Sequence, residues 1–281
     1  MAKVSVSAVW DRATEFLGDN IAPVIAIALP FVYLPQLVQT SLQPIASDPT
    51  SGGIVIFVSF VAILVGIWGQ LQVMALALDP GRPAGDARAV AAVGLLRVIV
   101  VSILLSIATL MLFVPIIGAL WGAGIDFEAV ARASASGTAP PPPPGMTTSI
   151  GWFLVLYATA MALFLIWAGV RLFVVNTVIL AEGKMLEAIA RSFQITRGHT
   201  LALIGLMLLY GIVSFVAVLA AQTVFGSIFG LVLGGEGRIT IATVMTAAVS
   251  AMVATAFALL LASFAAHFYL AVRARDVADA A

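Results

Sequence analysis

The chain has 281 residues, of which 62% are hydrophobic and 9% are charged. A soluble domain carries charge on about 25% of its residues, so a water-soluble globule of this length cannot be built from this composition. Thirteen basic and thirteen acidic residues give no net charge, which argues against a nucleic-acid partner because that partner requires a basic surface. The absence of cysteine excludes a disulfide framework, a thiolate metal site and a cysteine nucleophile.

Residues 4–17 have the pattern of an amphipathic helix, since apolar side chains recur at helical spacing and Asp11 and Glu15 face the other way. Gly18 and Asn20 follow, and these residue types favour a helix end and a new N-cap. We therefore expect residues 1–20 to form an interfacial helix followed by an elbow. The apolar stripe consists of Val6, Val9, Trp10, Ala13, Phe16 and Leu17.

Six apolar runs are long enough to cross a bilayer, whose hydrocarbon core takes roughly 20 residues of helix. The first run is too long and too late for a secretory signal, and Pro23, Pro30 and Pro35 predict a kink within it. None of the runs contains Asp or Glu. We expect one all-α membrane domain, a polytopic bundle of about six transmembrane helices with amphipathic elbow helices. The runs are residues 21–45, 54–78, 94–121, 151–180, 200–233 and 240–272.

The connections between the runs differ in charge. Nine of the thirteen basic residues lie in the N-terminal segment, 79–93, 181–199 and the C-terminal tail. The other connections, 46–53, 122–150 and 234–239, contain only Arg132 and Arg238. The positive-inside rule therefore predicts that both termini are cytoplasmic, and the even number of spans agrees with this orientation.

The predicted extracytoplasmic connection 122–150 contains five consecutive prolines, Pro140–Pro144. Such a run favours polyproline II structure. It is either a docking segment for a partner or a solvated spacer, and the small, polar residues 133–139 favour the spacer.

Residues 184–197 repeat the amphipathic pattern of the N-terminus, with an apolar stripe through Leu186, Ile189 and Phe193. Gly198 and Thr200 then predict a second elbow and N-cap. A weaker third copy covers residues 86–94. The pattern suggests three repeated units, each an elbow helix followed by a helical hairpin.

Residues 171–210 combine an arginine within a run, a Glu-Gly turn, an A-x-x-R-S helix and an Arg-Gly elbow. These features are Arg171, Glu182–Gly183, Ala188–Ser192 and Arg197–Gly198, and the last run closes with Tyr269, Arg273 and Arg275. In this the chain resembles the membrane domain of the glycerophosphoryl diester phosphodiesterase family, best over about the last 110 residues. The resemblance implies a stand-alone protein of the bacterial inner membrane that lacks the catalytic barrel of the fused members, and it does not imply hydrolysis.

Catalytic and metal-binding motifs are missing from the sequence. There is no H-E-x-x-H zinc motif, no G-x-S-x-G elbow and no G-x-x-x-x-G-K phosphate loop. All thirteen carboxylates lie outside the apolar runs, so we expect no acid–base pair within the membrane. We therefore expect a non-enzymatic protein without metal or cofactor, and only a cleft gathering Glu182, Glu187 and His199 would indicate an enzyme.

Arg171 is the most informative polar residue, because it lies within a run and no run contains an acidic partner. One interpretation is that it snorkels to the inner interface and meets a helix-end carbonyl. The other is that it binds the phosphate of an anionic membrane lipid together with Arg97, Arg191 and Arg197.

Two functions remain open from the sequence. The first is a membrane protein that binds anionic lipid or a partner at a basic cytoplasmic face. The alternative is a transporter or channel for a small or amphipathic solute, which a cavity lined by Gln70, Gln72 or Asn176 would favour, although each amide could instead bond a neighbouring helix.

Small residues in the last two runs predict close helix packing, inside the monomer in preference to a homo-oligomer. They are Gly226, Gly230 and Gly234, and Ala247, Ala251, Ala254, Ala258, Ala262 and Ala265.

Overall fold

The computed structural model describes residues 5–46, 52–140, 143–234 and 237–280. Within these ranges every regular element is a helix, which confirms the all-α prediction. Six helical segments are long and apolar enough to cross a membrane, and they correspond to the six runs. These segments are Ile21–Ile45, Gly52–Leu78, Gly85–Gly122, Thr148–Glu182, Thr200–Leu233 and Ile241–Ala278.

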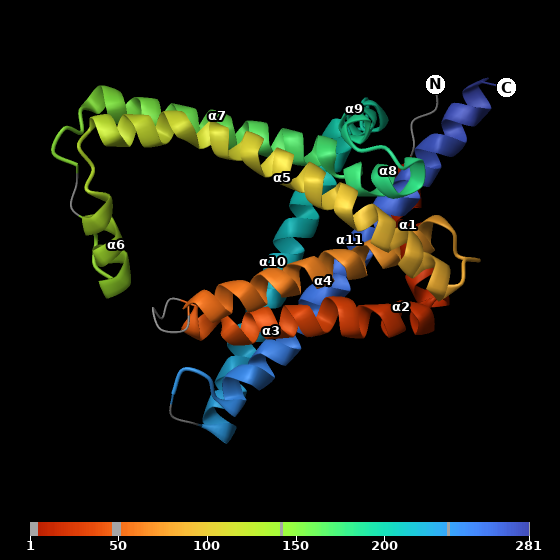
Figure 1. Ribbon diagram of the computed structural model, residues 1–281, viewed down its shortest axis with the longest axis horizontal. Helices are drawn as coiled ribbons and strands as arrows, with labels where there is room; N and C mark the ends of the chain where they lie inside the picture. The colour runs from red at the N-terminus through yellow and green to blue at the C-terminus, as the bar shows by residue number, and fades with distance from the viewer. Residues whose placement is uncertain (1–4, 47–51, 141–142, 235–236, 281) are drawn as a thin grey trace. The chain divides into compact units, whose positions relative to one another are not determined.

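The helices follow one another with few residues between them (Figure 1). In chain order they are α1 (Val6–Asp19), α2 (Ile21–Ala28), η1 (Leu29–Tyr33), α3 (Leu34–Leu42), η2 (Gln43–Ile45), α4 (Gly52–Leu78), α5 (Ala84–Gly122), α6 (Phe127–Ser136), α7 (Thr148–Leu172), α8 (Val175–Glu182), α9 (Leu186–Ile195), α10 (Thr200–Leu233) and α11 (Ile241–Ala280).

The chain folds as two compact units, and each is described by itself. The main unit contains the residues up to Val98 and those from Val170 onward, and the smaller unit contains Ile99–Gly169. In the main unit α11 packs against several helices, among them α3, α4 and α10. Helix α10, in contrast, packs mainly against α11. The α2–α3 segment lies alongside α4, and α10 lies alongside α11 (Figure 1).

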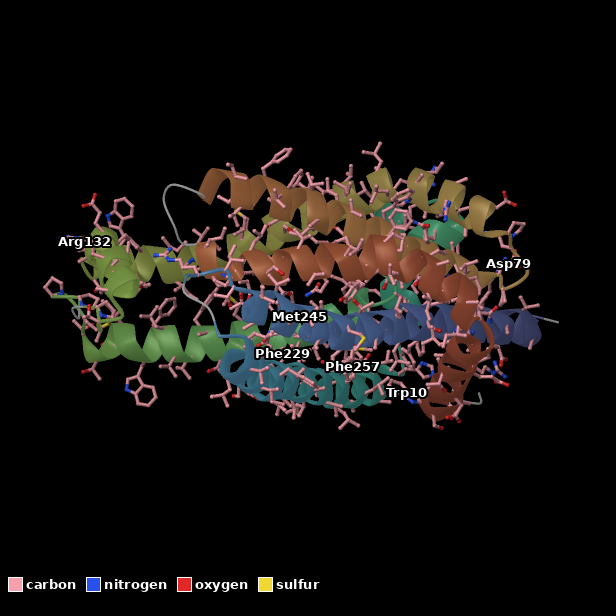
Figure 2. The ribbon with its side chains drawn as sticks, turned by 90° about the horizontal axis from the view of Figure 1, so that it is seen from below. Trp10, Asp79, Arg132, Phe229, Met245 and Phe257 are labelled. Atoms are coloured by element: carbon pink, nitrogen blue, oxygen red, sulfur yellow. The ribbon has the colours of Figure 1, made fainter. Side chains whose placement is uncertain are left out.

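The exterior of the membrane-spanning helices is apolar. Leu201 and Leu231 on α10 are 86% and 88% exposed, and side chains such as Phe229 and Met245 line the α10–α11 pair (Figure 2). Patches of this kind are not tolerated in water on a soluble monomer. The exposed apolar surface and the six apolar segments identify a multi-pass membrane protein.

The first span departs from regular α-helix at two of the three prolines from which the sequence predicts a kink. Regular α-helix ends at Ala28, a π-helical turn covers Leu29–Tyr33, and α-helix resumes at Leu34. Pro30 and Pro35 have no backbone N–H to donate to the helical ladder, so the ladder changes register there. Gly69 of α4 faces this turn closely, because a Cβ built on it would lie 2.5 Å from the carbonyl oxygen of Phe31.

Helix α1 forms as predicted, and the structure accounts for its apolar stripe by packing on α11. Val9, Ala13 and Phe16 are buried, and the Ser263 hydroxyl of α11 donates a hydrogen bond to the Ala13 carbonyl at 3.1 Å. The predicted elbow differs in detail. Gly18 lies inside α1, and the Asn20 side chain donates to the Phe16 carbonyl and does not cap α2.

The second elbow is present, with α9 ending at Ile195 and Gly198 at φ +86°. The prediction that Thr200 caps α10 is wrong, because His199 occupies that position and the Thr200 hydroxyl donates to the Thr196 carbonyl. The prediction of a third elbow is also wrong. Residues 86–94 belong to the continuous helix α5, since no residue there has a conformation that ends a helix.

The smaller unit contains most of α5 and α7, joined by the connection that carries α6. Asp126 caps the start of α6 by accepting a hydrogen bond from the Ala129 N–H at 3.0 Å, and Gly137 ends it at φ +68°. Part of the predicted spacer, residues 133–136, is therefore helical. Residues 141–142 of the proline run lie outside the described part of the chain. The Tyr157 hydroxyl donates to the Leu112 carbonyl at 2.9 Å and joins α7 to α5.

The connections rich in basic residues meet at one end of the main unit. Helices α1 and α8 both pack on α11, Arg191 of α9 pairs with Asp276 of α11, and Gly94 of α5 lies against Leu180 of α8. The connections that carry most of the basic residues thus also lie close together in space. That this end faces the cytoplasm stays a prediction.

Candidate functional site

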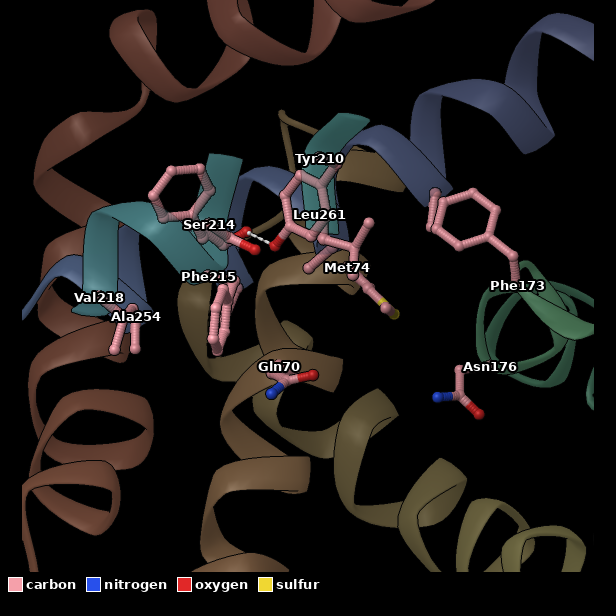
Figure 3. Close-up of a pocket in the computed structure, with 14 residues that line it drawn as sticks. Gln70, Met74, Phe173, Asn176, Tyr210, Ser214, Phe215, Val218, Ala254 and Leu261 are labelled. Atoms are coloured by element: carbon pink, nitrogen blue, oxygen red, sulfur yellow. Dashed lines mark hydrogen bonds between the residues drawn. The ribbon is translucent and has the colours of Figure 1, made fainter. Parts of the chain in front are cut away.

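A cavity of about 550 Å³ lies in the main unit between α4, α8, α10 and α11 (Figure 3). Its walls are mostly apolar and aromatic, and its polar side chains are Gln70, Asn176, Tyr210 and Ser214. None of its lining residues is charged. Its volume and lining are those of a small-molecule site, which typically measures about 300–1,000 Å³ and has a few polar groups on apolar walls.

The local structure of each helix places these polar groups. Gln70 and Met74 are one turn apart on α4 and share the face that lines the cavity. Asn176 lies in the first turn of α8, after Phe173 and Val174 interrupt the helix between α7 and α8. That interruption turns Phe173 and Asn176 toward the same cavity.

The polar groups of the cavity differ in whether the protein already bonds them. The Tyr210 hydroxyl donates to the Phe257 carbonyl at 2.8 Å, and the Ser214 hydroxyl donates to the Gly211 carbonyl at 3.1 Å. Within the described ranges, no hydrogen bond joins the amide of Gln70 or Asn176 to another protein group. These two amides therefore remain able to bond a ligand.

Gln72, the third amide singled out in the sequence, does not line this cavity. It is fully buried, and neither its oxygen nor its nitrogen has a hydrogen-bond partner among the residues described. Gln70 and Gln72 are about 200° apart around α4, so they face different neighbours.

Arg171 lies in the last turn of α7 and contacts the end of α9. Its Nη1 atom donates to the Phe193 carbonyl at 2.9 Å and lies 3.5 Å from the Thr196 hydroxyl. The Ser192 hydroxyl donates in return to the Arg171 carbonyl at 2.6 Å. The last carbonyls of a helix lack intrahelical donors and carry partial negative charge, so this arginine meets a helix end, as one of the two interpretations expected.

Arg191 and Arg97 lie near the end of α8. Arg191 is 3.5 Å from Glu182 and 3.2 Å from Asp276, and the Tyr269 hydroxyl donates to Glu182 at 3.1 Å. The guanidinium of Arg97 lies against Gly183, where a built Cβ would be 3.3 Å from its Nη1 atom.

The fourth predicted phosphate ligand, Arg197, is exposed at the second elbow. The structure therefore brings Arg97 and Arg191 to the end of α8. Arg171 lies at the C-terminal end of α9, whereas Glu187 lies in the first turn of that helix. Phosphate binding by these four residues stays a prediction.

The residues that could have formed a catalytic cleft have separate partners. Glu187 pairs with Lys184 at 2.9 Å, and the hydrogen bond from Lys184 to Glu187 raises the pKa of that lysine. Glu182 binds Arg191 and Tyr269, and the ring of His199 stands edge-on to Phe268 at 5.9 Å. The described residues contain no cluster of three metal-ligating side chains.

Tyr210 and Ser214 were not singled out in the sequence. The signal that could have found them is their spacing of four within an apolar run, which places two polar side chains on one helix face. Comparison of the chain with models of protein families, with curated proteins and with solved structures finds no match.

Proposed function

We propose that this membrane protein binds an uncharged amphipathic molecule in the cavity between α4, α8, α10 and α11. The observation that carries the proposal is the pair of amides, Gln70 and Asn176, which line a mostly apolar cavity without a protein hydrogen-bond partner among the described residues. The alternative that the sequence left open was a transporter or channel for a small or amphipathic solute, and this proposal takes from it the amphipathic solute, as a bound molecule without charge.

The chemistry of the lining supports an uncharged ligand. An amide in an apolar environment is destabilising unless it is hydrogen-bonded, so a polar group of the ligand between Gln70 and Asn176 is favourable. The surrounding wall, with Phe173, Phe215 and Phe257, provides apolar surface for a hydrocarbon chain. A charged headgroup would lose its hydration here without an oppositely charged partner.

Binding of an anionic lipid at the basic end is the second candidate. The observation in its favour is that Arg97, Arg191 and Arg197 lie at the end of the main unit to which the basic connections belong. It has less support, because Arg171 and Arg191 already bond a carbonyl and two carboxylates. For either ligand we propose a non-enzymatic protein of the bacterial inner membrane with both termini cytoplasmic.

Thermal unfolding of the detergent-purified protein tests whether the cavity binds an uncharged lipid. A ligand that binds only the folded state raises Tm, and the rise increases with the ratio of free ligand concentration to Kd. We expect glucosylceramide, a neutral lipid with a hydroxylated headgroup, to raise Tm, and phosphatidylglycerol to raise it less. The double variant Gln70→Leu/Asn176→Leu should lose the shift caused by glucosylceramide.

Gln39→Leu is the matched control, because this half-buried amide on α3 lies outside the cavity. It should keep the full shift. The proposal is wrong if glucosylceramide causes no shift in the unsubstituted protein, or if the double variant keeps the shift. A larger shift with phosphatidylglycerol that disappears in Arg171→Leu would instead support the anionic-lipid site.

A further inference from the structure

A second cavity, of about 490 Å³, lies at the other end of the α10–α11 pair. Thr40 and Gln43 line it from the end of the first span, and Gln222 lines it from α10. Its lining, like that of the first cavity, contains polar groups and no charged residue. Two cavities with the same chemical character therefore lie in the main unit.

The same face of α11 lines both cavities. Ala247 and Ser250 border the second cavity, and Ala254 and Ala258 border the first, at successive turns of one helix. From Ala242 to Ala265 the lined stretch is about 35 Å long at the helical rise per residue. The hydrocarbon core of a bilayer is about 30 Å thick, so the two cavities together extend over the thickness of a membrane.

A single row of residues on α10 forms the opposite wall of both cavities. The spacing of four makes this row a continuous ridge on the helix surface. Its members from the first cavity to the second are Tyr210, Ser214, Val218, Gln222, Gly226, Gly230 and Gly234. Val218 is the apolar residue at the middle of the row, one turn from both Ser214 and Gln222.

The packing of the main unit explains why no neighbouring helix covers this row of α10 residues. Helix α10 packs principally on α11, and α11 packs on α3 and α4. Both cavities are bordered by α10 and α11 together with the α3–α4 side of the unit, α4 at the first cavity and the end of α3 at the second. The two cavities border adjacent turns of α11, since Ser250 lines the second and Ala254 the first.

We propose that the two cavities are the two ends of one route, along which an uncharged amphipathic lipid crosses the membrane. This inference rests on the proposed function, because it takes the ligand of the first cavity as the molecule that moves. The polar headgroup passes from Gln70 and Asn176, past Val218, to Gln222 and Gln43. The hydrocarbon chain leaves the apolar wall of the first cavity and follows the headgroup through the surrounding lipid.

The glycines of α10 provide a way to block the second cavity alone. Gly230 lines that cavity, and a Cβ built on it meets no atom within 4 Å. Gly230→Leu therefore adds a bulky side chain at the wall of this cavity, and its Cβ fits without displacing the backbone. Gly211→Leu is the matched control, because this glycine of the same helix is also open and lines neither cavity.

Transbilayer movement in proteoliposomes tests the route. The probe is glucosylceramide with a nitrobenzoxadiazole-labelled acyl chain, placed in the inner leaflet of phosphatidylcholine vesicles and reduced by external dithionite as it reaches the outer leaflet. We expect the protein to raise the rate about tenfold over empty vesicles, equivalent to a modest lowering of the barrier. Gly230→Leu should return the rate to that of empty vesicles while it keeps the Tm shift with glucosylceramide, and Gly211→Leu should keep both.

A labelling variant makes the test independent of whether Gly230→Leu folds. The chain has no cysteine, so Gln222→Cys carries a single thiol that a bulky maleimide blocks after reconstitution. Blocking should stop movement, whereas the same label on Thr223→Cys, which is exposed and outside the cavity, should not. The labelled phosphatidylglycerol analogue should move no faster than in empty vesicles.

The outcomes separate the route from the proposed function. A Tm shift without faster movement overturns the route and leaves the binding site in place. Unchanged movement in Gly230→Leu and in blocked Gln222→Cys removes the second cavity from the route. Absence of both the Tm shift and movement overturns the proposed function together with the route, and equal movement of phosphatidylglycerol overturns the restriction to uncharged lipids.

Discussion

The guanidinium of Arg171 donates a hydrogen bond to the carbonyl oxygen of Phe193 across 2.9 Å. Arg171 belongs to the last turn of α7 and Phe193 to the last turns of α9. The Ser192 hydroxyl, adjacent to Phe193, donates to the Arg171 carbonyl at 2.6 Å. Side chain and backbone of one residue thus join two helices, and the arginine offsets the partial negative charge at the end of α9.

We predict that Arg171→Leu lowers the free energy of unfolding. The Phe193 carbonyl would lose its charged donor, and a hydrogen bond to a charged group is worth about 1.5–3 kcal/mol. Arg171→Lys should lose less than Arg171→Leu, because a lysine keeps the charge but not the planar donor fork. Reversible unfolding in mixed micelles measures the difference.

The same variants distinguish the two interpretations of Arg171. If Arg171→Leu unfolds like the unsubstituted protein and loses copurified anionic lipid, the residue is a phosphate ligand and its contact with α9 is incidental. Native mass spectrometry of the purified variants measures the retained lipid.

We predict that Gly69→Ala destabilises the protein through the close approach of α4 to η1. The added methyl group would lie 2.5 Å from the Phe31 carbonyl oxygen, which is backbone and cannot rotate away. Overpacking of this kind typically lowers stability by about 1–3 kcal/mol. Gly66→Ala is the control on the same helix, because its Cβ would meet nothing within 4 Å.

Gly66→Ala should leave stability unchanged or raise it slightly, since alanine is the better helix former. If both alanine variants unfold at the same denaturant concentration, the approach of α4 to Phe31 is looser than the structure describes.

We predict that Gln72→Leu stabilises the protein. Both polar atoms of this fully buried amide have no hydrogen-bond partner in the part of the chain described, and such a group is unfavourable by about 1–3 kcal/mol. Leucine is apolar and similar in size. Gln39→Leu, at a half-buried amide, should change stability less, and a loss of stability in Gln72→Leu would show that the amide has a bound partner.

The sequence was sufficient for the spans and for the place where the first one departs from regular α-helix. A helix that crosses a bilayer must bond its own backbone over a fixed length, so apolar run length predicts it directly. Proline cannot donate to the helical ladder, and the irregular turn η1 lies at Pro30 and Pro35 for that reason. Both signals are local, and the structure follows both.

The cavity could not be derived from the sequence, because it depends on which helices meet. Gln70 and Gln72 are two residues apart in similar surroundings, and only the packing of α4 decides that Gln70 faces the cavity and Gln72 the interior. The break between α7 and α8, which places Asn176, consists of Phe173 and Val174. Neither is a proline or a glycine, so the sequence has no signal for a helix break there. Conversely, the glycine at position 94 suggested a third elbow, but α5 continues through it.

We predict that the end of the main unit formed by α1, α8, α9 and the last turns of α11 faces the cytoplasm. Most of the basic residues outside the spans lie in the connections that meet there, and positive connections are retained on that side during insertion. Green fluorescent protein fused after Ala281 should therefore fluoresce. Alkaline phosphatase inserted after Gly137, an exposed residue that ends α6, should be active, because the charge bias predicts that the connection 122–150 is extracytoplasmic.

Removal of basic charge tests the cause of this orientation as well as the orientation itself. Replacing Arg82 and Arg197, which are not ion-paired across helices in the described residues, by glutamine removes basic charge without breaking an ion pair between helices. If the positive-inside bias sets the topology, this variant should give a mixed population in which part of the phosphatase activity and part of the fluorescence are lost together. Matched replacement of Arg132 and Arg238 should leave both reporters unchanged. A dark terminal fusion with an inactive phosphatase insertion in the unsubstituted protein would reverse the orientation.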